Sequence, residues 1–291
     1  MINKNGRLKL AIQKDGRITE ESIALLRASG LEFESAQRRL FSPCANFPLD
    51  VLSLRDDDIP EYVQDGVSDL GIVGANVLEE KGARVKIVER LAFGKCRLAI
   101  CVPKTGELKT LESLRAKRIA TSYPKTLDRF LSLRGVEADI IEISGAVEIA
   151  PALNVADAIC DIISTGSTAR MNGLEPLFTV LESEALLIAN EQVFESSIRS
   201  DEIKRLLMRI RSSLRARGKK YVMMNAPRSS VDLLKQLVPG MKSPTVVPLA
   251  NPELVAIQSV VGEEVFWEVI EQLKRAGASD IVVTPIEKII P

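Results

Sequence analysis

The sequence predicts an α/β fold in which two similar lobes precede a smaller C-terminal domain. Over about the first 190 residues, apolar runs of strand length alternate with helical patterns. This alternation starts afresh after Pro103, as expected if the chain builds two sheets in turn. Towards the C-terminus the order becomes βαββαβ, the ferredoxin-like arrangement. The expected domains are residues 1–103 completed by about 182–217, residues 104–181, and residues 218–291.

The first lobe is expected to contain helices between its strands. Thr19 starts a helix with two acidic residues in its first turn, and Gly30 stops it. Asp57 or Asp58 caps a second helix, which has a proline near its first turn. A third helix follows the third strand. The expected strands are Arg7–Ile12, Leu49–Leu54, Leu70–Val73, Val85–Leu91 and Arg97–Val102.

The second lobe repeats this pattern. Helices are expected at Lys125–Leu133 and Val147–Leu153. A strand at Leu177–Leu181 and the run Ala185–Ala189 can lead the chain back to the first lobe. Two lobes joined in this way form a hinged cleft that suits a ligand held between them. The other expected strands are Arg118–Ala120, Ala138–Ile143 and Ala158–Ile163.

The C-terminal part begins with a long basic helix, Ser200–Arg217, which Gly218 stops. The domain that follows carries no convincing catalytic constellation. A small appended domain of this kind suggests assembly or effector sensing, and assembly is the simpler alternative. Its elements are expected at strand Lys220–Met224, helix Ser230–Leu237, strands Thr245–Leu249 and Val255–Val261, helix Glu263–Ala276 and strand Asp280–Thr284.

Composition limits the classes of function. Lys plus Arg equals Asp plus Glu, 39 each, so no overall charge favours nucleic acid or an anionic membrane. No stretch has the length of a transmembrane helix and the N-terminus lacks a signal-peptide pattern, so a cytoplasmic location is expected. The four cysteines form no CxxC pair and are expected to be reduced thiols. The chain has no histidine, which excludes histidine-dependent catalysis and leaves Mg²⁺ as the obvious candidate metal.

The most informative stretch is a strand that runs into a hydroxyl-rich loop at residues 164–168. The loop's N–H groups can hold a phosphate monoester if it wraps against a following helical turn. Asp161, just before the loop, repels phosphate but suits ribose hydroxyls or a metal ion, so the combination suggests a sugar phosphate. The alternatives are an ordinary turn and a buried, hydrogen-bonded acid. The loop residues are Ser164, Thr165, Gly166, Ser167 and Thr168.

Basic residues recur near the expected strand ends. Lys14 and Arg17 flank Gly16 directly after the first strand. Ligands of open α/β sheets sit beyond the carboxyl ends of the strands, and Arg suits a bidentate grip on phosphate oxygens. Each residue by itself is more often a surface charge, so only their recurrence near the expected strand ends favours a binding site. The further members of this set are Arg38, Arg39, Arg55, Lys95 and Arg97.

Over essentially its whole length, the chain resembles the ATP phosphoribosyltransferase family in its long, histidine-regulated form. The resemblance implies a two-lobed, periplasmic-binding-protein-like catalytic core and a ferredoxin-like regulatory domain. It rests on blocks that occur in this order: Gln13–Arg17, Arg55–Pro60, Asp69–Gly74, Gly94–Arg97, Arg118–Pro124, Gly145–Pro151 and the loop at 164–168.

The resemblance implies the first reaction of histidine biosynthesis. N1 of the ATP adenine attacks C1 of phosphoribosyl pyrophosphate and pyrophosphate leaves. The loop at 164–168 is then expected to hold the 5′-phosphate, and Glu148 and Asp161 the ribose hydroxyls. For Glu148 the alternative is an acid favoured at a helix N-terminus. The residues expected to face pyrophosphate and the ATP phosphates, with Mg²⁺ bridging phosphate oxygens, are Lys14, Arg17, Arg39 and Arg55, of which the first three are the catalytic candidates.

The resemblance also implies feedback inhibition by histidine at the C-terminal domain and a homo-oligomer, from dimer to hexamer. Thr245 and Asn225 are the candidate inhibitor contacts. The alternative function is a two-lobed small-molecule-binding or regulatory protein without turnover, because such proteins share the hinged architecture.

Overall fold

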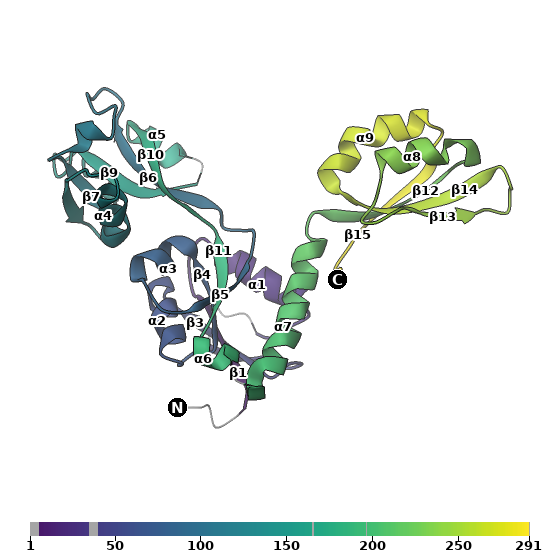
Figure 1. The fold of residues 1–291 in the computed structure, drawn as a ribbon, viewed down its shortest axis with the longest axis horizontal. Coiled ribbons are helices and arrows are strands. Elements are labelled where there is room, and N and C mark those ends of the chain that lie inside the picture. Colours follow the sequence, from purple (N-terminus) through teal and green to yellow (C-terminus); the bar gives the residue numbers. More distant parts are fainter. Residues whose placement is uncertain (1–5, 35–39, 165, 196, 291) are drawn as a thin grey trace. The chain divides into compact units, whose positions relative to one another are not determined.

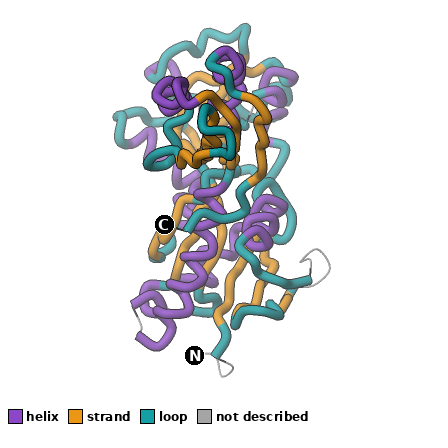
Figure 2. The backbone as a smooth tube through the Cα atoms, turned by 90° about the vertical axis from the view of Figure 1, so that its right-hand side faces the viewer, coloured by secondary structure: helices purple, strands orange, loops and turns teal. Residues whose placement is uncertain are grey.

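The computed structural model describes residues 6–34, 40–164, 166–195 and 197–290 (Figure 1). The chain forms two compact units. The first comprises the chain up to Ala24 together with Leu31–Lys204, and the second comprises Leu25–Gly30 and the chain from Arg205 onward. The first unit contains two sheets and the second contains one. Figure 2 distinguishes the helices from the strands that they flank.

The first sheet has the strand order β2-β3-β1-β4-β11-β5. Strands β3, β1 and β4 are parallel, so their carboxyl ends lie at one edge. Beyond β4, strand β11 pairs antiparallel with β4, and β5 pairs antiparallel with β11. At the other edge of the sheet, β2 pairs antiparallel with β3. The elements are β1 (Leu8–Gln13), α1 (Thr19–Ala28), β2 (Phe41–Pro43), β3 (Leu49–Leu54), η2 (Asp56–Asp58), α2 (Ile59–Gln64), β4 (Leu70–Gly74), α3 (Ala75–Lys81), β5 (Lys86–Arg90) and β11 (Ala185–Ala189).

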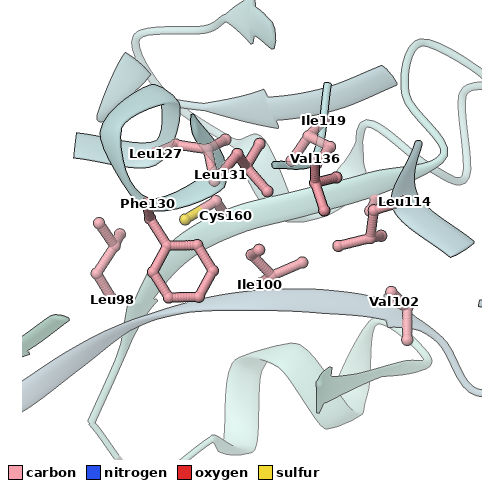
Figure 3. Close-up of a cluster of buried hydrophobic side chains, with 11 residues drawn as sticks. Leu98, Ile100, Val102, Leu114, Ile119, Leu127, Phe130, Leu131, Val136 and Cys160 are labelled. Carbon is pink, nitrogen blue, oxygen red and sulfur yellow. The ribbon is translucent and has the colours of Figure 1, made fainter. Parts of the chain in front are cut away.

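The second sheet has the order β10-β6-β9-β7-β8. Strands β8, β7 and β9 are parallel to one another, β6 pairs antiparallel with β9, and β10 pairs antiparallel with β6. Leu127, Phe130 and Leu131 of α4 pack with residues of the sheet in one buried cluster (Figure 3). The elements are β6 (Cys96–Pro103), η3 (Glu112–Leu114), β7 (Arg118–Thr121), α4 (Pro124–Ser132), β8 (Asp139–Glu142), η4 (Val147–Ile149), β9 (Ala158–Ile163), α5 (Ser167–Met171) and β10 (Leu174–Ser183).

We call the elements around these two sheets the first lobe and the second lobe. Each has a parallel triplet in which the first strand along the chain lies between the other two. Two connectors join the lobes, residues 91–95 between β5 and β6, and Glu184 between β10 and β11. They run side by side, because the Leu91 N–H donates to the Ala185 carbonyl and the Ala185 N–H to the Phe93 carbonyl. β6 lies in the second sheet, although the expected boundary placed residues up to 103 in the first lobe.

The second unit contains a four-stranded antiparallel sheet in the order β13-β14-β12-β15. Helices α8 and α9 lie on one face of this sheet (Figure 1). A βαββαβ chain with this strand order is the ferredoxin-like arrangement, so the expected fold class is confirmed. The remaining elements are α6 (Glu191–Glu195), α7 (Ser197–Ala216), β12 (Lys219–Pro227), η5 (Arg228–Ser230), α8 (Val231–Leu237), β13 (Thr245–Pro248), β14 (Leu254–Gly262), α9 (Glu263–Arg275) and β15 (Ser279–Pro285).

Some local expectations were wrong. The expected helix Val147–Leu153 is a single 3₁₀ turn, η4, because Pro151 has no N–H to continue an α-helix. Asp58 stands at the N-cap of α2, but its side chain makes no capping hydrogen bond. Strand β2 and helix α6 were not expected. No helix among the described residues is long and apolar enough to span a bilayer.

Candidate active site

Three of the expected basic residues lie at the carboxyl edge of the first-lobe sheet. Lys14 follows β1 and Arg55 follows β3, and these strands are paired as far as Gln13 and Leu54. The Lys14 N–H donates to the Leu54 carbonyl at 2.7 Å, so the two loops begin side by side. Lys14, Arg17 and Arg55 are all exposed. This edge therefore offers a group of cations to an anionic ligand.

The Arg17 guanidinium reaches the connector at residues 91–95, where its Nη1 donates to the Gly94 carbonyl. Gly94 has a φ of 61°, and a Cβ added there would lie 2.5 Å from Cγ2 of Ile18. Only glycine therefore lets the connector approach this loop so closely. A guanidinium has five N–H donors, so the bond to Gly94 leaves Arg17 able to grip phosphate oxygens as well.

In the second lobe, Asp161 of β9 and Glu148 of η4 lie within electrostatic reach of each other. Burial raises the pKa of Asp161, a hydrogen bond from the Ile162 N–H lowers it, and the negative charge of Glu148 raises it again. The Ile162 bond to Asp161 Oδ1 measures 2.7 Å. Two neighbouring carboxylates supply acceptors for a pair of sugar hydroxyls.

The expected phosphate loop follows β9 and leads into α5. Ser164 is exposed directly after the strand, and Gly166 turns the backbone with a φ of 73°. A residue with a side chain is strained at this angle, so the glycine shapes the loop. Ser167 and Thr168 begin α5. Thr165 and Arg39 lie outside the described residues.

Tyr123 is where the two lobes meet near these groups. Its hydroxyl accepts a hydrogen bond from Nδ2 of Asn76 in the first lobe, at 3.0 Å. Burial raises the pKa of Tyr123, the Asn76 bond lowers it, and the charges of Asp161, Asp56 and Asp57 raise it. Carboxylates of both lobes thus act on one phenol.

Sequence reasoning did not single out Asn76 or Tyr123. Asn76 is buried and also exchanges hydrogen bonds with Ser183: its N–H donates to Ser183 Oγ at 3.1 Å, and that hydroxyl donates to Asn76 Oδ1 at 2.7 Å. Tyr123 stands inside the block Arg118–Pro124, which was a usable signal. Nothing around Asn76 in the sequence marks it, since its partners are 47 and 107 positions away.

The thiols do not supply a nucleophile. All four cysteines are free and buried. Burial raises the pKa of Cys101 to about 12, and burial also raises the pKa of Cys160 well above its usual value. Both thiols are therefore protonated near neutral pH, whereas the thiolate is the reactive form.

The described residues contain no cluster of three or more acidic or thiol side chains that could hold a metal by itself. A cation here would need donors from its ligand. Glu148 and Asp161 are the protein groups that could add to those donors, because hard cations prefer carboxylate and phosphate oxygens.

The two C-terminal candidates share the sheet face opposite the buried core. Thr245 pairs with Gln258, which pairs with Met223, and Asn225 lies two residues further along β12. Successive side chains of a strand alternate between faces, so Thr245 and Asn225 point to the same side. Thr245 is exposed, and Asn225 Nδ2 donates to Asp280 Oδ2 at 3.1 Å.

Comparison with known proteins identifies close relatives. The family model "ATP phosphoribosyltransferase" (HisG) matches residues 55–212, and "HisG, C-terminal domain" matches residues 216–288. ATP phosphoribosyltransferase of Parabacteroides distasonis is 48% identical over 97% of this chain and 99% of its own. The ATP phosphoribosyltransferase of Cytophaga hutchinsonii is 50% identical over 97% of this chain and 98% of its own. The solved ATP phosphoribosyl transferase (HisG:HisZ) complex from Thermotoga maritima has a TM-score of 0.59 at 28% identity, and covers 70% of this chain and 98% of that chain.

Proposed function

The chain belongs to the ATP phosphoribosyltransferase family in its long form, and from this premise we propose how its residues divide the first reaction of histidine biosynthesis. The enzyme is a pentosyltransferase that joins ATP and phosphoribosyl pyrophosphate, giving N1-(5-phosphoribosyl)-ATP and pyrophosphate. One observation carries the division of labour. The carboxyl edge of the first-lobe sheet exposes the cations Lys14, Arg17 and Arg55, whereas the second lobe offers two acids and a hydroxyl-rich loop.

The second lobe is suited to the ribose phosphate. The residues from Ser164 to Thr168 bind the 5′-phosphate through N–H and hydroxyl groups. Asp161 and Glu148 accept hydrogen bonds from the ribose hydroxyls. Two observations support a joint role for these carboxylates. The charge of Glu148 acts on Asp161, and Asp161 lies three residues before the loop.

The first lobe is suited to the phosphate chains. Lys14, Arg17 and Arg55 are exposed at one edge, and Arg39 is proposed to act with them. As the bond from C1 to pyrophosphate breaks, negative charge grows on the leaving oxygen, and these cations stabilise it. The adenine N1 already carries a lone pair, so no strong base is needed. Alignment of N1 with C1 is then the main task of the protein.

We propose that Mg²⁺ reaches the site on the substrate phosphates. Asp161 and Glu148 are the carboxylates that would supply oxygen ligands to it from the protein. When bound, the ion neutralises charge on the departing pyrophosphate.

We further propose that the C-terminal sheet senses histidine and assembles the protein into dimers and hexamers. Its outer face presents Thr245 on the edge strand β13, and Asn225 of β12 hydrogen-bonded to the Asp280 carboxylate, polar groups able to bind an amino acid by hydrogen bonds and charge. The same face exposes apolar side chains, which favours burial against another copy. They are Met223, Val247 and Val282. A cytoplasmic location fits an enzyme that consumes ATP.

An assay with protein, ATP, phosphoribosyl pyrophosphate and Mg²⁺ tests the activity. Pyrophosphate release together with the changed absorbance of the ribosylated adenine is expected. Binding of both substrates without release would instead favour a two-lobed binding or regulatory protein. The site assignment is tested separately, by a crystal soaked with phosphoribosyl pyrophosphate. A ribose phosphate bound away from Asp161 would contradict it.

A further inference from the structure

A polar contact joins the two lobes apart from the connectors, between α3 and the N-terminal end of α4. Glu80 Oε1 accepts a hydrogen bond from the Lys125 N–H at 2.9 Å. Glu80 Oε2 accepts one from the Thr126 N–H at 2.9 Å and one from the Thr126 hydroxyl at 2.7 Å. Beside it, Glu79 pairs with Arg129. One carboxylate of the first lobe thus takes three hydrogen bonds from a helix of the second.

Glu80 supplies a cap that α4 lacks locally. Tyr123 occupies the N-cap position without a side-chain capping bond. Pro124 has no N–H, and the Leu127 N–H bonds to the Tyr123 carbonyl at 3.0 Å. The N–H groups of Lys125 and Thr126 therefore depend on Glu80, and its negative charge also suits the positive end of the helix dipole.

Both helices are anchored in the cores of their own lobes. Val77 and Leu78 of α3 pack with first-lobe residues, and α4 is held by the apolar cluster of Figure 3. A change in the angle between the lobes must therefore change the geometry between Glu80 and α4. The connectors are two short segments of chain, which act as a hinge if nothing else restrains them.

We propose that Glu80 is a positioning residue for phosphoribosyl transfer, because it caps α4 from the other lobe and so sets the angle at which the lobes present their substrates. This rests on the proposed function, in which the ribose phosphate belongs to the second lobe and the phosphate chains to the first. Misplacement of reacting groups by about 1 Å can lower a rate by about 100-fold. Loss of the cap thus affects turnover more than the binding of a ligand that touches only the second lobe.

Steady-state kinetics and binding of ribose 5-phosphate test this proposal. Glu80→Ala should lower kcat by about 10- to 100-fold. Its Kd for ribose 5-phosphate, measured by calorimetry, should stay within about twofold of the unchanged protein. Glu80→Gln keeps an acceptor oxygen, and its kcat should lie between those of Glu80→Ala and the unchanged protein. Glu61→Gln, an exposed change on α2, is the matched control and should leave both quantities unchanged.

Hydrogen exchange reads the contact without reference to activity. In Glu80→Ala the amides of Lys125 and Thr126 should exchange faster, while those of the buried strand β7 keep their rates. Thr126→Val removes the hydroxyl at nearly constant shape and should lower kcat, whereas Thr126→Ser retains the hydroxyl and should restore it.

The proposal is overturned if Glu80→Ala keeps the wild-type kcat or raises it. It is also overturned if kcat and ribose 5-phosphate affinity fall together, since that pattern indicates general damage to the second lobe. Failure of the proposed function looks different: the unchanged protein would release no pyrophosphate, while the exchange measurement would still report the cap.

Discussion

Asp161, the proposed acceptor for the ribose hydroxyls, is a residue whose burial affects the stability of the fold. Burial is the largest cause of its raised pKa, and the charge of Glu148 adds to it. Folding therefore favours the protonated carboxyl. Its stabilising contribution is complete below the ordinary pKa of about 3.9 and is lost as the pH rises through the raised pKa. Near pH 7 the ionised side chain destabilises the fold.

Asp161→Asn should accordingly raise the Tm at pH 7, and the gain should vanish as the pH approaches about 4. The same change should raise the KM for phosphoribosyl pyrophosphate by about 10-fold, because a charged acceptor for the ribose hydroxyls is lost. Thermal unfolding across this pH range and initial rates check the two effects. An unchanged KM would remove Asp161 from the ribose site.

Asp157 provides a control, because its pKa is shifted in the direction opposite to that of Asp161. Hydrogen bonds from the Arg118 side chain are the main reason that its pKa is lowered. Its stabilising contribution is present above the ordinary carboxyl pKa and is lost as the pH falls through the lowered one. Asp157→Asn should therefore lower the Tm at pH 7. A rise in both variants would mean that the local charges were assigned wrongly.

Arg17 is proposed to stabilise the leaving group from the loop after β1, where its guanidinium also donates to the Gly94 carbonyl. Arg17→Ala should lower kcat/KM by about 100-fold, the usual loss when a charge-stabilising donor is removed from an active site. Arg17→Lys keeps the charge without the planar fork and should lose less. Arg84→Ala, an exposed change in the first lobe, should have no effect on pyrophosphate release. Equal rates for Arg17→Ala and Arg84→Ala would contradict the role.

At the scale of elements, a buried ion pair ties the start of β4 to α7. Arg199 Nη1 lies 2.5 Å from Asp69 Oδ1, and the two side chains are only 12% and 6% exposed. Asp69 Oδ2 accepts a further bond from the Lys9 N–H at 2.7 Å. Burial raises the pKa of Asp69 even though the Lys9 N–H and Arg199 lower it. The carboxylate therefore depends on its partners to remain charged.

Arg199→Ala should lower the free energy of unfolding by about 3 kcal/mol, because it leaves a buried carboxylate without its cation. Urea unfolding followed by circular dichroism measures the change. Lys204→Ala removes an exposed cation from the same helix and should change stability by less than about 1 kcal/mol.

Combining Arg199→Met with Asp69→Asn tests the explanation. The double variant should lose less stability than Arg199→Ala, since no unpaired charge remains. A larger loss in the double variant would show that packing, rather than charge, holds these elements together.

At the scale of the whole molecule, the C-terminal domain has its own core. Val222, Met224 and Ile257 of the sheet pack there with Phe266 and Leu273 of α9. A chain ending after Gly218 should therefore keep pyrophosphate release, but histidine should no longer inhibit it. Initial rates at increasing histidine concentration check this outcome.

Thr245→Val in the full chain is the matched control for the truncation. It should raise the histidine concentration for half-inhibition by about 10-fold without changing kcat, because it removes one hydroxyl from the proposed inhibitor face. Unaltered inhibition in the truncated chain would place the inhibitor elsewhere.

Most elements could be predicted because their signals are local. The bounds of β3 and β9 match the apolar runs Leu49–Leu54 and Ala158–Ile163, and polar residues end both runs. Helix α6 also had a local signal that was overlooked: Asn190 caps it, with Oδ1 accepting the Val193 N–H at 3.1 Å. The three-residue β2 had none, since it forms only by pairing with β3.

The sequence by itself determined the candidate site residues, their order along the chain and the chemistry that they can perform, because residue type and position relative to a strand end are local properties. Only the tertiary structure decided that Asn76 meets Tyr123 and that Glu80 caps α4. A hydrogen bond selects its partner by distance and direction in space. Partners separated by 45 or more residues are fixed only when both lobes have folded and the connectors have brought them together.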